Sequence, residues 1–329
     1  LIAPRRSPPP LLKLESSTAL TTTQMLQTPD AWLLCGVGSI VIGGGNMLST
    51  NMAQVVQACG AADALVPAVV TLFATGNMLG RLVATIASDA LLASRGRSRV
   101  WFAAGIAALM AVAHLTLLLA AVVDAGSPLQ ASLLAFGGFF AGVAFGAMWP
   151  HLVVLASELF GSRHLAANYM FFDGGCGAVG TLLLANLLPT HFYSAAAPAP
   201  EGASSGAADA GADGDLPGEC SSNTTAARCL GSACFMPTHA IIAGLCVVAA
   251  VAAAIVARRS AGLYQQIKRN ADLARRDALD PVDGRTAEVS EVQPRLRAPL
   301  AAPLLGAGAT LSDYHLQEPP ASLGLRARA

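Results

Sequence analysis

Residues 100–123 read VWFAAGIAALMAVAHLTLLLAAVV, a stretch without a single charged side chain. A helix of roughly 20 apolar residues crosses the hydrocarbon core of a bilayer, so this stretch is long enough to span a membrane. Its apolar residues do not alternate with polar ones, and it is about twice as long as a barrel strand. Because lipid leaves only helices and closed barrels as spanning structures, the stretch is predicted to be a transmembrane helix.

The rest of the chain repeats this pattern. Hydrophobic residues make up 54% of the sequence and charged residues only 12%, whereas soluble domains usually carry about 25% charged residues. The mean hydropathy is +0.55. The predicted spans are residues 32–58, 64–87, 100–123, 130–157, 165–188 and 238–257. The fold class is therefore predicted to be an all-α membrane protein with a bundle of six transmembrane helices.

Basic residues are distributed very unevenly between the two predicted sides. Eighteen of the 20 Lys and Arg residues lie on the side of the termini, while Arg81 falls inside a span and Arg228 lies on the other side. Positive loops stay in the cytoplasm, so both termini are predicted to be cytoplasmic, as an even number of spans requires. The formal net charge is zero, which gives no reason to expect a nucleic-acid partner.

The chain divides into three predicted parts. Residues 1–30 are expected to be a disordered cytoplasmic arm, residues 31–258 the six-helix transmembrane domain, and residues 259–329 a disordered cytoplasmic tail. Within the membrane domain, the exoplasmic loop at 189–237 has too little apolar surface to fold and is expected to be largely disordered. The basic start of the tail either lies against anionic headgroups or is a solvated flank. The first residue is Leu1, and the sequence is expected to be a fragment or an incomplete gene model.

The long exoplasmic loop carries two candidate covalent modifications. Asn223 begins an Asn-Thr-Thr sequon for N-glycosylation. Cys229 and Cys234 would close a small loop in an oxidising compartment and are the preferred disulfide. The alternatives are free thiols and an unused sequon. The remaining cysteines in or near spans are expected to be small buried residues: Cys35, Cys59, Cys176 and Cys246. No zinc-ligand spacing is present, so neither a metal site nor a cofactor is expected.

Two charged residues lie at membrane depth, where burial of a charge is costly and each charge is a functional candidate. Arg81 is predicted in the second span, and either contacts a solute or snorkels to the interface. Asp173 is predicted in the fifth span, and serves either proton coupling or cation contact, or else a structural hydrogen bond between helices. A direct pair between Arg81 and Asp173 is conceivable from the sequence.

Several amides accompany these charges. Asn51 and Gln54 are three residues apart and Asn77 and Arg81 are four apart, so each pair shares a helix face. A cavity lined by amides and one guanidinium would suit an anionic or polar solute. Hydrogen bonding between helices is the alternative for each amide.

Glycines gather in three spans. The sequence places Gly43 to Gly45 in the first span, Gly138, Gly142 and Gly146 in the fourth, and Gly174, Gly175, Gly177 and Gly180 in the fifth. Small residues at a spacing of four allow close approach of two membrane helices. The glycines of the fifth span are expected to loosen it and to permit bending, and close packing without motion is the alternative.

The loop after the second span carries a known pattern: Gly80-Arg81-Leu82, Ser88-Asp89 and Arg95-Gly96-Arg97-Ser98-Arg99. It resembles the cytoplasmic loop signature of the major facilitator superfamily. The resemblance implies a cytoplasmic gate in which Asp89 pairs with loop arginines, whose members here are Arg95, Arg97 and Arg99. Thr85 stands where that family usually has glycine.

A second set of motifs is more specific: Phe145-Gly146-Ala147-Met148-Trp149-Pro150, Ser157-Glu158-Leu159-Phe160-Gly161, Asn168-Tyr169, Asn51-Met52-Ala53-Gln54 and Cys229-Leu230-Gly231-Ser232-Ala233-Cys234-Phe235. In this order they resemble the nodulin-like, nuclear-fusion-defective branch of the superfamily. The resemblance covers about residues 30–265 and implies the C-terminal half of a twelve-helix transporter, whose missing N-terminal six-helix half is the expected partner.

The resemblance also implies a function, namely alternating-access transport of a small solute. Its similarity to monocarboxylate and oxalate/formate carriers favours a small organic anion moved with a proton, with Arg81 contacting the carboxylate and Asp173 carrying the proton. The alternative is a non-transporting membrane receptor, scaffold or regulatory half-transporter. An enzyme is not expected, because the sequence shows no nucleophile–base set and no metal cluster.

Overall fold

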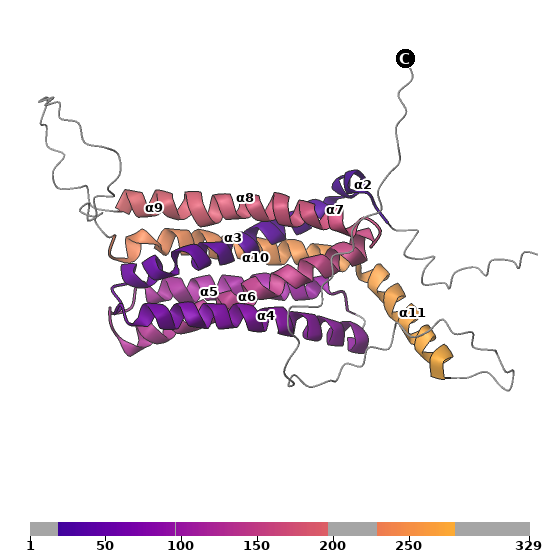
Figure 1. The fold of residues 1–329 in the computed structure, drawn as a ribbon, viewed down its shortest axis with the longest axis horizontal. Coiled ribbons are helices and arrows are strands. Elements are labelled where there is room, and N and C mark those ends of the chain that lie inside the picture. Colours follow the sequence, from indigo (N-terminus) through magenta and orange to yellow (C-terminus); the bar gives the residue numbers. More distant parts are fainter. Residues whose placement is uncertain (1–18, 96, 197–228, 280–329) are drawn as a thin grey trace, which may run out of the picture. The chain divides into compact units, whose positions relative to one another are not determined.

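The computed structural model describes residues 19–95, 97–196 and 229–279, which form a bundle of helices (Figure 1). Within this part of the chain, six helices are long and apolar enough to cross a membrane, which confirms the predicted all-α membrane fold. Five are single helices, and the fifth in chain order is composite. The single helices are α3 (Pro29–Ala58), α4 (Leu65–Arg95), α5 (Val100–Ala120), α6 (Pro128–Phe160) and α10 (Met236–Arg259).

The composite helix runs from residue 165 to residue 196 and is called the fifth span below. Its segments are α7 (Leu165–Met170), the π-helix η1 (Phe171–Gly177), α8 (Ala178–Gly180), the π-helix η2 (Thr181–Leu187) and α9 (Leu188–Ala196). Wide π turns inside membrane helices are uncommon and occur often at functional sites. The predicted loosening of this glycine-rich span therefore takes the form of two π segments.

Local chemistry fixes where the helices begin. The Thr28 hydroxyl caps α3 by accepting a bond from the Ala31 amide, with Pro29 at the first helical position and Asp30 in the first turn. Ser127 caps α6 in the same way, again followed by a proline. The two helices start three and two residues earlier than the apolar pattern alone predicted, because that pattern cannot register the capping turn.

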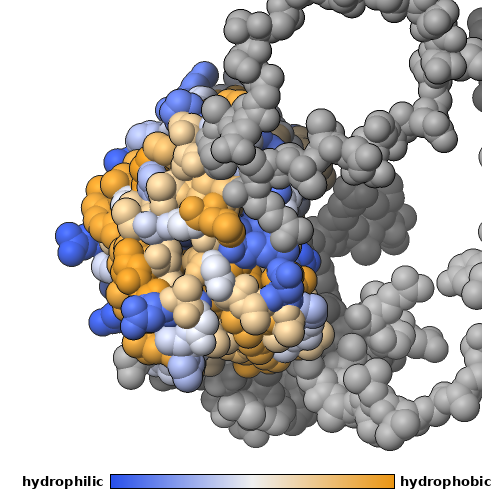
Figure 2. All heavy atoms as spheres, turned by 90° about the vertical axis from the view of Figure 1, so that its left-hand side faces the viewer, coloured by the Kyte–Doolittle hydropathy of each residue, from blue (hydrophilic) through white to orange (hydrophobic). Residues whose placement is uncertain are grey.

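The two ends of the bundle differ in charge. At one end of the bundle, α3 and α5 begin and α4, α6 and α10 finish. Three ion pairs join these helix ends: Arg99 to Asp89, Arg99 to Glu158, and Arg259 to Asp30. We call this the basic end. Figure 2 looks onto the opposite end, where hydrophilic residues are scattered among hydrophobic ones.

Helices α3 and α6 lie at the centre of the bundle. The fifth span and α10 pack on α3, α4 and α5 pack on α6, and the two outer helices α5 and α10 pack on each other. If α3, α4 and α5 are exchanged with α6, the fifth span and α10, in that order, the same pairs of helices remain neighbours. The bundle is thus two three-helix units with equivalent packing. The helices α4 and the fifth span are the least buried of the six.

Glycines bring α4 and α6 into backbone contact. A Cβ atom added at Gly142 would overlap the Phe73 carbonyl, and one at Gly146 would overlap the Asn77 carbonyl. Gly76 and Gly80 of α4 meet the backbone of α6 in return. The close approach predicted for the glycine face of the fourth span is therefore present. Gly43 of α3 and Gly180 of the fifth span form an equivalent crossing.

Both flanks of the bundle contain structure where disorder was predicted. Helix α2 (Thr22–Leu26) has a capping box between Thr21 and Gln24, and its Met25 is fully buried. Helix α11 (Ala261–Leu279) leaves the basic end at an angle to the bundle and contacts α4 (Figure 1). Its Tyr264 is fully buried. The prediction of disorder was wrong at residues 19–28 and 261–279, because a few apolar anchors dock these polar segments. Residues 1–18 and 280–329 lie outside the described residues.

Two disulfides are present among the described cysteines. Cys229 and Cys234, the preferred pair, are joined beside the short helix η3 (Ser232–Cys234), with an S–S distance of 1.98 Å. Asn223, the glycosylation candidate, and Cys220 lie outside the described residues.

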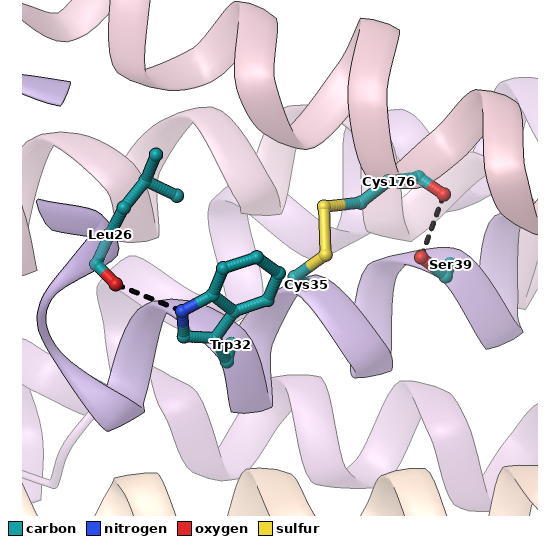
Figure 3. Close-up of a disulfide and its surroundings, with 5 residues drawn as sticks. All are labelled: Leu26, Trp32, Cys35, Ser39 and Cys176. Atoms are coloured by element: carbon teal, nitrogen blue, oxygen red, sulfur yellow. Dashed lines mark hydrogen bonds between the residues drawn. A yellow bond between two sulfur atoms is a disulfide. The ribbon is translucent and has the colours of Figure 1, made fainter. Parts of the chain in front are cut away.

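The second disulfide corrects a prediction. Cys35 and Cys176 were expected to be small buried residues, but they form a disulfide across 141 residues of sequence. Figure 3 shows the bond linking α3 to η1, with the Ser39 hydroxyl donating to the Cys176 carbonyl at 2.7 Å nearby. The Trp32 indole donates to the Leu26 carbonyl on the other side. Sequence composition could not reveal the pair, because only the packing of α3 against the fifth span brings the two sulfur atoms together.

Candidate functional site

Arg81 lies halfway along α4, on the poorly covered side of that helix. Its side chain is exposed in the bundle, and its Nε donates to the Asn77 carboxamide oxygen at 3.2 Å. The pairing of residues four apart is the one predicted from the sequence. Because Asn77 accepts a hydrogen bond only from Nε, the two terminal nitrogens of the guanidinium are available to bind a planar anion.

Asp173 lies on η1, in the fifth span, and its side chain is partly buried. The π turn widens the helix at this residue. Within the described part of the chain no ion pair joins Asp173 to Arg81. The conceivable direct pair is therefore not formed in this structure.

Tyr169 connects these two charges. It lies four residues before Asp173 on the same span and is within electrostatic range of both the Asp173 carboxylate and the Arg81 guanidinium. Arg81 from α4 and Asp173 from the fifth span are thus coupled electrostatically through Tyr169. We call these three residues, with Asn77, the polar face. Tyr169 was absent from the predicted site, although its spacing of four from Asp173 was a usable signal.

Asn51 and Gln54 lie elsewhere, towards the opposite end of α3. The Asn51 amide donates to the Met47 carbonyl at 3.0 Å and to the Ala185 carbonyl of the fifth span at 3.3 Å. Hydrogen bonding between helices, the alternative interpretation, therefore accounts for this amide. Gln54 is exposed and lines, with Asn51, a cavity of about 240 Å³ beside α9.

Other polar residues of α3 form hydrogen bonds with the π segments. The Asn46 amide donates to the Thr181 hydroxyl at 2.7 Å, in addition to the bond from Ser39 to Cys176. A π turn shifts the backbone hydrogen-bond ladder of a helix, and side chains from a neighbouring helix can satisfy the groups it releases. These bonds support the unusual geometry of the fifth span next to Asp173.

The predicted gate is only partly assembled from the predicted residues. Arg99 binds Asp89 at 2.8 Å and Glu158 at 2.7 Å, which joins the ends of α4 and α6 to the start of α5. The Tyr264 hydroxyl of α11 donates to the second oxygen of Glu158 at 2.7 Å. Glu158 and Tyr264 were both missing from the prediction, since their distance in sequence hides the contact.

Arg99, Asp89, Glu158 and Tyr264 form a network of charge-assisted bonds at the predicted gate. Burial, together with the neighbouring Glu158 carboxylate, raises the pKa of the Tyr264 phenol far above its usual range, so the hydroxyl remains a donor at physiological pH. Arg97 is exposed and, among the described residues, forms no ion pair. Arg95 ends α4, and its side chain lies outside the described part of the structure.

One further polar pair lies away from these sites. The Nδ1 atoms of His114 on α5 and His239 on α10 are 3.0 Å apart, and both rings are fully buried. Within the described residues, no group of three or more His, Cys, Asp or Glu side chains is placed to hold a metal ion.

Comparison with known proteins adds no assignment. No family model, no curated protein and no solved structure matches the chain. The polar face and the gate are therefore interpreted from their own chemistry.

Proposed function

We propose that this chain is the C-terminal six-helix half of a major facilitator-type secondary transporter of the nodulin-like branch, and that it moves a small organic anion together with a proton. The observation that carries the proposal is the electrostatic coupling of Arg81 and Asp173 to one phenol, Tyr169. A cation, a phenol and a carboxylate at membrane depth are expensive to maintain unless they meet a solute, an ion or water.

The packing of the helices supports the architecture. Two three-helix units with equivalent neighbours are the arrangement expected of three-plus-three repeats within each half of such a transporter. The two least-buried spans, α4 and the fifth span, are also the two that supply the polar face. A second six-helix bundle packing on that side would cover the exposed apolar residues of both spans and would enclose the polar face between the halves.

The chemistry of the polar face favours a carboxylate. A guanidinium held at Nε by Asn77 presents its terminal nitrogens as a fork, which matches the two oxygens of a carboxylate. Asp173, when ionised, partly neutralises the positive potential of Arg81 and so weakens its attraction for an incoming anion. Protonation of Asp173 removes this competition, so proton and anion binding reinforce each other.

The gate supplies the two-state element that alternating access requires. Arg99 links α4, α5 and α6 at the basic end, which the positive-inside bias assigns to the cytoplasm. In the proposed cycle these bonds hold the cytoplasmic side closed and separate when the two halves rock about the polar face. Tyr264 ties α11 to the same network, so the tail helix follows the state of the gate.

Uptake into proteoliposomes containing the full-length protein tests this function. With labelled lactate and labelled oxalate as alternative solutes, acidifying the outside should accelerate saturable uptake of the transported anion by about tenfold per pH unit where proton binding limits the rate. One proton carried with a monocarboxylate makes the step electroneutral. A potassium-diffusion potential should therefore leave lactate uptake unchanged.

Empty liposomes provide the control for diffusion of the protonated acid through lipid. Uptake of both anions that equals the empty-liposome rate at every pH would contradict transport of small carboxylates. Saturable uptake that does not depend on the pH gradient would support transport but exclude proton coupling. It would then also exclude the role proposed for Asp173.

A further inference from the structure

A groove separates α4 from α5 on the outside of the bundle. The two helices are consecutive in the chain, yet both pack on α6 and scarcely approach each other. The groove between them has a volume of about 430 Å³. Residues of α6, Val143 and Ala147, form its floor.

Small and apolar side chains create this groove. Gly80 packs directly against the α6 backbone, and Gly105 has no heavy atom within 4 Å of the position a Cβ would occupy. Val83, Ile106 and Leu109 supply apolar walls. These walls offer no partner to a polar ligand, but they make favourable van der Waals contacts with a hydrocarbon chain.

The length of the groove restricts its occupant. Along α4 it extends from Leu91 to Gly80, which at 1.5 Å per residue is about 16 Å. This is roughly half of the ~30 Å hydrocarbon thickness of a bilayer. A transmembrane helix of a partner would need the full thickness, whereas the acyl chain of a lipid occupies one leaflet. The groove therefore fits a lipid tail better than it fits another helix.

Positive charge lies at the mouth of the groove. Arg97 and Arg99 line it at the basic end, next to Trp101 and Phe102. The guanidinium of Arg99 is taken by Asp89 and Glu158, while Arg97 is exposed and forms no ion pair within the described residues. An aromatic ring beside a free cation is typical of the depth at which lipid headgroups lie.

We propose that this groove binds one anionic phospholipid of the leaflet at the basic end, with an acyl chain along α4 and α5 and the phosphate paired with Arg97. Basic residues at the mouth of a pocket between membrane helices are suited to acidic headgroups. The inference concerns the lipid-facing side of the bundle and does not depend on transport through the polar face. Because Arg99 lines the groove and also belongs to the gate, a bound lipid contacts the segment that closes the basic end.

Native mass spectrometry of the full-length protein in detergent tests the site, with phosphatidylglycerol and phosphatidylcholine of identical acyl chains as the two probes. The wild-type protein should retain one phosphatidylglycerol in preference to phosphatidylcholine. Arg97→Gln should weaken phosphatidylglycerol binding about fivefold, since a basic residue near the headgroups contributes on the order of 1 kcal/mol. It should thereby remove most of the preference between the two lipids.

Two matched glycine variants test the groove itself. Gly105→Leu places a side chain in the groove and should lower the binding of both lipids at this site. Gly244→Leu is the control, because Gly244 on α10 is likewise exposed and has no atom within 4 Å of an added Cβ, but lies outside the groove. Circular dichroism and elution volume establish that both variants retain the helical bundle.

Equal retention of the two lipids by the wild-type protein would overturn the proposal. Unchanged binding in Gly105→Leu, or an unchanged preference in Arg97→Gln, would overturn it as well. If Gly105→Leu alone failed to fold, the exposed Arg97 variant would still decide the role of the headgroup site.

Discussion

Gly146→Leu should prevent stable packing of the bundle. A Cβ at this position overlaps the Asn77 backbone of α4, and leucine adds three more heavy atoms where two backbones already touch. The helices must move apart, which removes close packing along the whole α4–α6 crossing. We expect a loss of at least about 3 kcal/mol, seen as a fall of roughly 10 °C in the apparent melting temperature of the purified protein.

The matched control for this variant is again Gly244→Leu, where the added side chain faces open space. It should melt within about 2 °C of the wild-type protein. If Gly146→Leu melted as close to wild type as the control does, the backbone contact between α4 and α6 would not exist in the membrane.

The second large effect is expected at Arg81. Arg81→Ala removes the proposed carboxylate contact and should reduce proton-driven uptake about 100-fold, the equivalent of a charge-assisted contact of about 3 kcal/mol. Arg81→Lys keeps the charge but loses both the fork and the bond to Asn77, so an intermediate loss of about tenfold is expected. Initial rates in proteoliposomes, normalised to protein content, provide the measurement.

Arg163→Ala is the control, since Arg163 is an exposed basic residue in the connection between α6 and α7. It should transport at the wild-type rate. Wild-type uptake by Arg81→Ala would exclude Arg81 from solute binding and would leave the polar face without its central residue.

Local features of this fold were predictable from the sequence. The six spans follow from uninterrupted apolar length, and the Asn77–Arg81 bond follows from helical spacing. The salt bridge between Asp89 and Arg99 joins residues that the loop pattern had already brought together. In each case the signal lies within a few turns of chain, where helix geometry alone determines which side chains meet.

Long-range features were not predictable from the sequence. The Cys35–Cys176 disulfide and the Tyr264–Glu158 bond depend on which helices become neighbours, and hydropathy does not encode this. Composition also misjudged α11, because a polar segment with one well-placed buried tyrosine resembles a disordered tail. The π segments around Asp173 could be expected only as a general loosening, since glycine content does not specify a hydrogen-bond register.

In the proposed transporter, α4 presents a water-exposed, solute-binding face rather than a face covered by lipid. Cysteine accessibility tests it most directly, in a background where Cys59, Cys220 and Cys246 are alanine. Ala74 is exposed and lies on the helical side of Arg81, two turns away, whereas Val112 is an exposed residue of the outer helix α5.

A thiol reacts with a charged methanethiosulfonate reagent as the thiolate, which forms in water and not in hydrocarbon. We predict that Ala74→Cys in the full-length protein reacts at least roughly tenfold faster than Val112→Cys, and that the transported anion slows only the Ala74→Cys reaction. Equally slow labelling at both positions would mean that lipid covers α4 as it covers α5, which would contradict a solute pathway along this face.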